Sequence, residues 1–125
     1  MKIVNIVSGK MKKDRLFVPL NDEAFYWFRN NNKNFELRGY FNGWREKYVY
    51  SGREIELRRG YNTKDKIFGK IGKVVIGSMN NIFDKVNYKK IIPIAKSRQE
   101  SIKKAKEILN KKKQHKKYIA FEVKL

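Results

Sequence analysis

Short runs in which apolar and polar residues alternate constrain the fold of this 125-residue chain more than any other feature. The run at the C-terminus is the most regular, because single residues separate Ile119, Phe121, Val123 and Leu125. Successive side chains of a β-strand point to opposite faces, so this spacing predicts a strand with one buried face. The end of the chain is therefore expected to belong to a sheet.

Several other short runs also predict strands. Phe35, Leu37 and Phe41 alternate with other side chains, and Ile55 and Leu57 do the same. Both patterns are typical of half-buried strands. Three further strands are expected at residues 3–7, 16–20 and 67–76, the last of them more fully buried.

Two of these predicted strands resemble each other. Segments 35–40 and 55–61 share the residues Glu-Leu-Arg, each following an apolar residue and preceding a glycine and a tyrosine. The sequence around the two segments does not match, so we interpret them as similar strands and not as a repeat architecture.

Two helices are predicted from their end signals. Asn21 precedes two acidic residues, as an N-cap residue does, and the asparagines at 30–32 can end the helix in a left-handed conformation. Ser97 and Glu100 have the spacing of a capping box, in which the glutamate reaches back to the serine N–H. Five to six short strands with two inserted helices predict an α+β domain, a small and mostly antiparallel pseudo-barrel. Residues 1–125 are expected to form that single domain.

The charge of the chain points to its partner. Lys and Arg number 31 against 12 Asp and Glu, which gives a formal net charge of +19. Solubility alone is served by a net charge of roughly 2–8 on a small domain, so this excess favours a polyanion such as nucleic acid. A merely cationic surface is the alternative.

Other classes of protein are disfavoured by what the sequence lacks. It has no cysteine and one histidine, which argues against disulfides, thiolate chemistry and a zinc site, so no metal or cofactor is expected. His115 lies among lysines and is interpreted as a bystander. We see neither a signal peptide nor an apolar run long enough to span a membrane. The expectation is a cytoplasmic protein, monomeric by default.

Basic residues near the C-terminus and on the predicted strands are candidates for phosphate contacts. The segment 96–117 is mostly basic on the exposed side of its predicted helix and in the loop that follows. Such surfaces bind phosphates without reading sequence, although a solvated helix face is the alternative. The candidates are Lys103, Lys104, Lys111 and Lys112, with Arg53, Arg58 and Arg59 on the strand side.

Trp44 is the best candidate for stacking on a base. It lies in the polar, turn-like sequence Asn42-Gly43-Trp44-Arg45, where burial is not obvious. An unpaired base gains roughly 1–3 kcal/mol from an aromatic platform. Packing over the mouth of the barrel is an equally good interpretation of Trp44.

Lys33, Glu36 and Arg38 are the strongest candidates for a site. Glu36 and Arg38 share one face of the predicted strand, and Lys33 stands at its entrance. Cations on both sides favour the charged form of a carboxylate, and an arginine suits a phosphate or carboxylate fork. The alternative is a solvated outer face with weak ion pairs.

The segment containing these residues resembles the opening of the ASCH domains, a branch of the PUA-like superfamily. Those domains carry a helix, a glycine and then Lys-Thr-hydrophobic-Glu-hydrophobic-Arg, which Lys33, Glu36 and Arg38 match in type and spacing. The glycine-led segments 52–57 and 69–75 are similar to the strands that follow, so the resemblance extends over about residues 16–125. Asn34 replaces the threonine of the motif, and Arg53 replaces a turn aspartate.

This resemblance implies a PUA-like pseudo-barrel with a cleft beside the Lys33 strand that holds RNA or a single, often modified, nucleotide. Some ASCH proteins are amidohydrolases that remove an acyl group from modified cytidine with a lysine, a threonine and a glutamate, and a related branch are ribonucleases. Lys33 corresponds to the lysine, and Glu36 stands where the threonine hydroxyl is needed. Glu100 corresponds loosely to the glutamate and is equally a capping residue.

Three hypotheses follow. The leading one is a nucleic-acid-binding module, with RNA favoured over DNA, that holds phosphates on its basic surface and an exposed or modified base in the cleft. The alternative is a hydrolase of a modified nucleoside or of RNA, in which Lys33 and Glu36 are the catalytic residues and Glu100 a weaker candidate. A third is a basic accessory protein that docks through its final helix. The sequence leaves open whether the chain is an enzyme.

Overall fold

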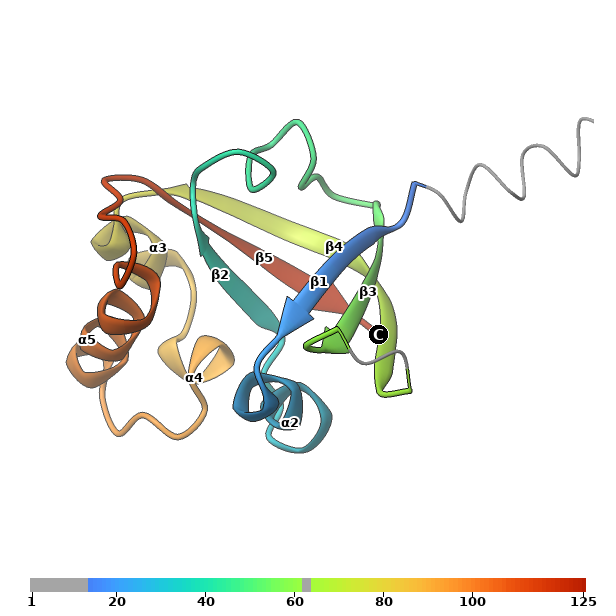
Figure 1. The fold of residues 1–125 in the computed structure, drawn as a ribbon. Coiled ribbons are helices and arrows are strands. Elements are labelled where there is room, and N and C mark those ends of the chain that lie inside the picture. Colours follow the sequence, from blue (N-terminus) through green and yellow to red (C-terminus); the bar gives the residue numbers. More distant parts are fainter. Residues whose placement is uncertain (1–13, 62–63) are drawn as a thin grey trace, which may run out of the picture.

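A five-stranded sheet forms the centre of the computed structural model, which describes residues 14–61 and 64–125 (Figure 1). Neighbouring strands follow the order β1-β3-β4-β5-β2; β1 and β3 run in parallel, and the other three pairings are antiparallel. The predicted α+β class and mostly antiparallel sheet are therefore confirmed, while the strand predicted at residues 3–7 lies outside the described residues. The strands are β1 (Leu16–Leu20), β2 (Phe35–Gly39), β3 (Glu54–Arg59), β4 (Lys66–Gly77) and β5 (Tyr118–Lys124).

Both predicted helices are present, and two short ones that the sequence did not indicate lie between β4 and the last helix. The predicted pair are α2 (Asp22–Asn30) and α5 (Arg98–Leu109). The additional pair are α3 (Met79–Lys85) and α4 (Tyr88–Ile91). Asparagines in α3 and its short length hide its helical pattern, since Asn is a weak helix former.

The ends of α2 and α5 show why they form where they do. Asn21 accepts a hydrogen bond from the Ala24 N–H at 2.7 Å, and Asn32, just beyond the helix, has a φ of 61°. Ser97 accepts from the Glu100 N–H at 3.1 Å, as a capping serine should. The Glu100 carboxylate, however, accepts from the Lys96 N–H at 3.0 Å, one residue before the expected position.

Two hydrophobic cores lie on opposite faces of the sheet, and β5 contributes to both. Ile119, Phe121 and Val123 face the interior of the half-barrel, where β1, β3 and α2 pack. Tyr118 and Ala120 face the other way, into a core closed by α3, α4 and α5. The alternation in the sequence is therefore real, but both of its faces are buried because helices cover the second one.

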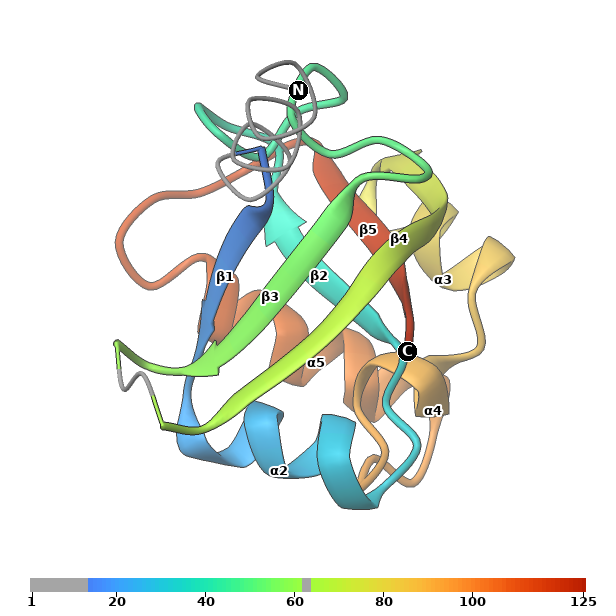
Figure 2. The same cartoon turned by 90° about the vertical axis from the view of Figure 1, so that its right-hand side faces the viewer.

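Three apolar residues of the predicted strands are exposed, contrary to expectation. Phe41 lies beyond the end of β2 with 43% of its surface exposed, and Leu125 is 78% exposed. Phe68 of β4 is 52% exposed, so this strand is less buried than predicted. Strand β2 ends at Gly39, where the His115 ring lies so close that a Cβ atom would stand 2.5 Å from it. In Figure 2 the described helices leave β3 and the first half of β4, which contains Phe68, uncovered, while α3 packs on β4 only near Val75.

The sheet curves until its two edge strands, β1 and β2, face each other across an opening. Arg38 of β2 spans this opening, because its Nη2 donates to the carbonyl of Pro19 in β1 at 2.8 Å. Helix α2 connects the two strands in sequence and lies beneath them in Figure 2. An edge strand has unpaired backbone groups, and here one arginine satisfies one of them.

Candidate ligand pocket between the edge strands

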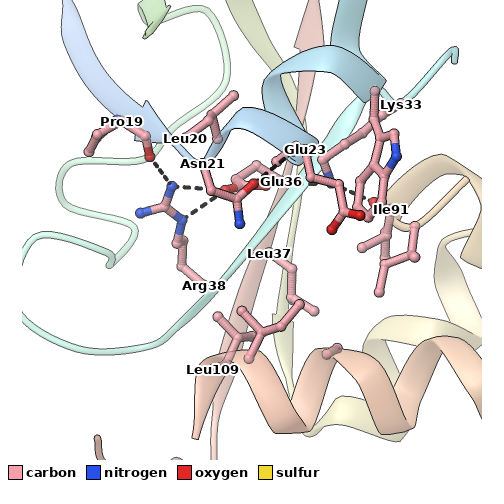
Figure 3. A pocket seen from close by; sticks show the side chains of 15 residues that line it. Pro19, Leu20, Asn21, Glu23, Lys33, Glu36, Leu37, Arg38, Ile91 and Leu109 are labelled. Carbon is pink, nitrogen blue, oxygen red and sulfur yellow. Dashed lines mark hydrogen bonds and ion pairs between the residues drawn. The ribbon is translucent and has the colours of Figure 1, made fainter. Parts of the chain in front are cut away.

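A pocket of about 260 Å³ lies where β1, α2, β2, α4 and α5 meet (Figure 3). One end of the pocket carries the predicted trio Lys33, Glu36 and Arg38, together with polar groups at the start of α2. Its other walls are apolar. They are made by Pro19, Leu20, Ala24, Trp27, Leu37, Ile91, Ile92, Ala105, Ile108 and Leu109.

Lys33 is buried, with 5% of its surface exposed, and its position depends on the turn that ends α2. After the left-handed Asn32, the Lys33 N–H donates to the Trp27 carbonyl at 3.2 Å. Its Nζ donates to the carbonyls of Phe35, at 2.6 Å, and Ile91, at 2.5 Å, and stands 3.4 Å from Glu36 Oε1. The ammonium group thus has two backbone acceptors and an ion-pair partner, and Lys33 links β2 to α4.

Burial lowers the pKa of Lys33, because desolvation disfavours an ammonium ion and outweighs the stabilising charge and hydrogen bond of Glu36. The ring of Phe28, whose centre lies 5.2 Å from Nζ, covers another side of the group. Lys33 is therefore held in a dry environment by fixed acceptors.

Glu36 is 8% exposed and lies between the two cations. Its Oε2 accepts from Arg38 Nε at 2.9 Å and stands 2.8 Å from Nη2 of the same guanidinium. Burial acts to raise the pKa of Glu36, but Arg38 and then Lys33 outweigh burial and hold this pKa below its usual value. The carboxylate is therefore charged, and the alternative of a solvated outer face is wrong for it.

Arg38 has one donor group left for a ligand. Its Nε and Nη2 are used by Glu36 and Pro19, whereas Nη1 has no partner among the residues that the structure describes. The side chain is 19% exposed and lines the pocket. Arg38 thus closes the opening of the half-barrel beside the pocket and keeps one charged N–H pair that no described residue uses.

Trp44 lies next to this arrangement and packs against the mouth of the half-barrel. Its ring stacks on Phe121, with centres 6.1 Å apart and planes 9° from parallel, and the Arg38 guanidinium lies 4.5 Å from the Trp44 ring centre. The packing interpretation of Trp44 thus describes what the structure contains, although the ring is only partly buried. Trp44 is not among the residues that line the pocket.

Of the predicted phosphate contacts, Lys104 lies nearest to the pocket. It lines a smaller hollow that shares Glu23, Trp27, Ile92 and Ile108 with the pocket. Glu100 lines neither hollow and caps α5. The other predicted contacts do not line the pocket: Arg53, Arg58, Arg59, Lys103, Lys111 and Lys112.

The arginines on the strand side have partners of their own. Arg53 donates to the backbone carbonyls of Asp14, at 2.8 Å, and Tyr48, at 2.5 Å. Arg58 is paired with Glu56, and Arg59 lies 2.7 Å from Asp65. These residues hold loops and strands together. Arg58 points to the outer face of the sheet with Glu56, and Arg59 lies beside Asp22 and Tyr26 of α2.

Several residues of the pocket were missed by the sequence analysis. Trp27 is buried in the core beneath the helices, and its side chain also forms a wall of the pocket. Ile91 supplies both a carbonyl for Lys33 and an apolar wall, and it lies in the helix α4 that was not predicted. Ala105, Ile108 and Leu109 of α5 form a further apolar wall, although only the basic side of this helix drew attention in the sequence.

Neither metal ligands nor a membrane span are found in the described part of the chain. In residues 14–61 and 64–125, no three His, Cys, Asp or Glu side chains are grouped to hold a metal ion. Over the same residues, no helix is long and apolar enough to cross a membrane.

Comparison with known proteins identifies the fold. Neither a family model nor a curated protein sequence matches this chain. Among solved structures, hypothetical protein PH0355 aligns with a TM-score of 0.69 at 17% identity, over 88% of this chain and 97% of its own. Protein PF0455 from Pyrococcus furiosus aligns with a TM-score of 0.61 at 17% identity, over 88% and 96% of the two chains.

A third similar structure is that of ASCH from Zymomonas mobilis. Its TM-score is 0.58 at 15% identity, over 87% of this chain and 66% of that one. Identities this low establish a common fold and leave the ligand of each protein to be argued from its own residues. The chain therefore has the PUA-like fold of the ASCH protein, as its lysine-glutamate-arginine motif indicated.

Proposed function

We propose that this protein binds RNA, holding an exposed base in the pocket and the neighbouring phosphates on the cations around it. The observation that carries the proposal is the paired trio Lys33, Glu36 and Arg38, with Lys33 and Glu36 buried, at one end of a mostly apolar pocket. Burying charged groups is expensive unless they are paired and hydrogen-bonded. Buried charged groups with shifted pKa values are common at sites that recognise a ligand.

The pocket suits one flat, partly polar group. Its volume of about 260 Å³ is just below the range of about 300–1,000 Å³ that is typical of small-molecule sites. Trp27 and the aliphatic side chains of α4 and α5 can cover the faces of a base. Arg38 Nη1 can donate to the edge of that base and Glu36 Oε1 can accept from it, as charged side chains do in base recognition.

The surroundings of the pocket favour a polymer over a free nucleoside. A free nucleoside gains little from a protein of net charge +19, whereas a strand of phosphates gains from every cation it reaches. Lys104 lies beside the pocket, and the exposed Lys103 lies on the same helix. The fold itself is commonly associated with RNA, which favours RNA over DNA.

Hydrolysis is the alternative, and one observation favours it: the pKa of the buried Lys33 is lowered, as an amine that acts as a base requires. Two others weigh against it. Lys33 already donates to two backbone carbonyls, and Glu100 is used in capping α5 and does not line the pocket. We therefore assign Lys33 the role of positioning Glu36 and the strand, not of attacking a substrate.

The test is a set of fluorescence-anisotropy titrations with structured RNA, single-stranded RNA and duplex DNA from about 50 to about 200 mM salt. The matched variant is Lys33→Met/Glu36→Leu, which removes one charge of each sign and so keeps the net charge. We expect one class of RNA to retain an advantage at the higher salt and the variant to lose that advantage.

Two results would contradict the proposal. The first is equal binding of all three polymers, with equal salt dependence in protein and variant, which would leave only a basic surface. The second is release of acetate from N-acylated cytidine, or cleavage of the RNA, by the wild-type protein but not by the variant. That result would replace binding by hydrolysis as the function of the pocket.

A further inference from the structure

The outer face of β1, β3 and β4 carries aromatic side chains in a row. The strand register sets Phe17 opposite Glu56 and Glu56 opposite Phe68, so these three side chains point the same way across three strands. Val18 and Leu57, the next residues along, point into the half-barrel core. Figure 2 looks onto these strands, and the described helices lie behind them, below them or, for α3, to their right.

Two arginines lie over the rings of this face. The Arg15 guanidinium is 4.8 Å from the centre of the Phe68 ring, and that of Arg58 is 4.5 Å from the centre of the Phe17 ring. Between them, the carboxylate of Glu56 pairs with Arg15 at 3.2 Å and also with Arg58. Glu56 is 7% exposed, so one buried carboxylate fixes two planar cations against two aromatic rings.

This face is open and positively charged. Phe68 is 52% exposed and Tyr61 is 82% exposed, and the Tyr61 ring centre lies 6.0 Å from that of Phe17. Lys66 and Lys70 stand on β4 opposite Arg58 and Glu54, on the same side as Phe68. Exposed rings beside cations differ from an ordinary solvated sheet face, where charged and small polar side chains prevail.

We propose that this face is a second nucleic-acid contact, at which unpaired bases of a single strand stack on the Phe17, Phe68 and Tyr61 rings and their arginine planes. Aromatic rings and guanidinium groups both stack on bases, and they do so without selecting a sequence. Arg15, Arg58, Lys66 and Lys70 supply cations for the phosphates between those bases. The face is separate from the pocket, and the proposal does not depend on what the pocket holds.

Spacing favours a single strand over a duplex. Phe17 and Phe68 stand on strands that flank β3, which places them about 10 Å apart. Bases within one strand of a duplex follow each other at about 3.4 Å and expose no ring faces. A splayed single strand can reach both rings. An acidic peptide would use the cations but gain nothing from the rings.

The test uses the full chain and a short fluorescein-labelled oligouridine in anisotropy titrations. The variants are Phe68→Leu and Phe17→Leu/Phe68→Leu, which remove the rings but keep apolar side chains. Tyr26→Leu is the matched control, because Tyr26 is 58% exposed but lies on α2. At about 200 mM salt we expect the double variant to bind about tenfold more weakly and the control to bind like wild type.

The dependence of affinity on salt should be unchanged in the ring variants, since they retain every cation. Phe68→Leu alone should weaken binding severalfold. Because Phe68 is exposed, a loss of folding would not account for that weaker binding. The same losses are expected in the Lys33→Met/Glu36→Leu background, which separates this face from the pocket. Wild-type affinity of both ring variants would overturn the proposal. The proposal would also be overturned if a polyglutamate peptide displaced the oligouridine equally well from the wild-type protein and from the double variant.

Discussion

The sequence Glu-Leu-Arg occurs on β2 and again on β3, and the two copies have opposite roles. On β2, Leu37 packs toward the helices and Glu36 points to the inner side of the half-barrel, beside Phe121. On β3, Leu57 points into the half-barrel and Glu56 points outward, beside Phe68. The same three residues therefore build a buried end of a pocket in one strand and a cation-bearing outer face in the other.

Position in the sheet accounts for this difference. Strand β2 is an edge strand, so its inner face opens onto the gap to β1, which Arg38 crosses. Strand β3 lies between two others, so its inner face must be apolar and its polar residues must point out. The local motif therefore specifies which charges pair, and the position of the strand in the fold determines whether that pair is accessible to a ligand.

The largest expected difference between the two clusters is in the cost of removing one cation. Lys33→Met leaves Glu36 buried with Arg38 alone and leaves the carbonyls of Phe35 and Ile91 without their donor. We expect a loss of about 3 kcal/mol in the free energy of unfolding, measured by urea denaturation. Arg15→Met is the matched change at Glu56, and it should cost about 1 kcal/mol or less, because Arg15 is 28% exposed. Equal losses would remove the distinction.

Removing both charges of the Lys33–Glu36 pair should cost less than removing the glutamate alone. Glu36→Leu leaves the cations Lys33 and Arg38 without their shared carboxylate, whereas Lys33→Met/Glu36→Leu also removes one of these cations. We expect the double variant to be about 2 kcal/mol more stable than Glu36→Leu in the same urea measurement. A double variant less stable than either single variant would show that the ion pair itself stabilises the fold.

Acid should weaken the fold through both glutamates, and more through Glu36. Folding lowers the pKa of Glu36, although burial alone would raise it. The charged Glu36 therefore stabilises the folded state above the pKa of the unfolded chain, and this stabilisation is lost as the pH falls through the pKa of the folded state. The pKa of Glu56 is also lowered, by Arg58 and Arg15 acting against burial, but these arginines are more exposed to solvent than Lys33. Below about pH 4, Glu36→Gln should flatten the fall of stability with pH more than Glu56→Gln. Thermal melts across that range measure it, and the reverse order would contradict this assignment.

The smallest expected difference concerns the two arginines of the repeated sequence. Arg38→Lys should lower stability by about 1 kcal/mol, because one ammonium cannot both pair with Glu36 through two nitrogens and reach the Pro19 carbonyl. The Arg58 side chain spans no gap between strands, so Arg58→Lys should lower the stability of the fold by only a few tenths of a kcal/mol. Thermal unfolding of the two single variants checks this, and a smaller loss for Arg38→Lys would show that the link to β1 is unimportant.

Much of this fold was predictable because its signals are local. The alternation in residues 118–124 predicted β5, and Asn21 and Ser97 marked the starts of α2 and α5. Glu36 and Arg38 share a face in any strand, so their pairing could be expected.

The remainder depends on contacts between distant segments. Nothing near Lys33 in the sequence indicates that the Ile91 carbonyl will accept a hydrogen bond from the Lys33 ammonium group, because the two residues are 58 positions apart. Trp44 shows the same limit, since its polar neighbours left stacking on a base and packing equally open, and its packing partner, Phe121, lies far away in the sequence on β5. The walls of the pocket likewise come from five elements, and one of these, α4, is a four-residue helix whose sequence pattern is weak.

We propose that the Glu36 cluster, and not the Glu56 cluster, binds a base within a pocket. The most direct measurement is ¹H–¹⁵N NMR of the arginine Nε–H and tryptophan indole N–H groups during titration with the four ribonucleosides and N-acylated cytidine. We predict saturable shifts of Arg38 and Trp27 with at least one nucleoside, while Arg58 remains unchanged because a single stacked base is held too weakly. Unchanged Arg38 and Trp27 signals throughout, or equal shifts of Arg38 and Arg58, would contradict the account.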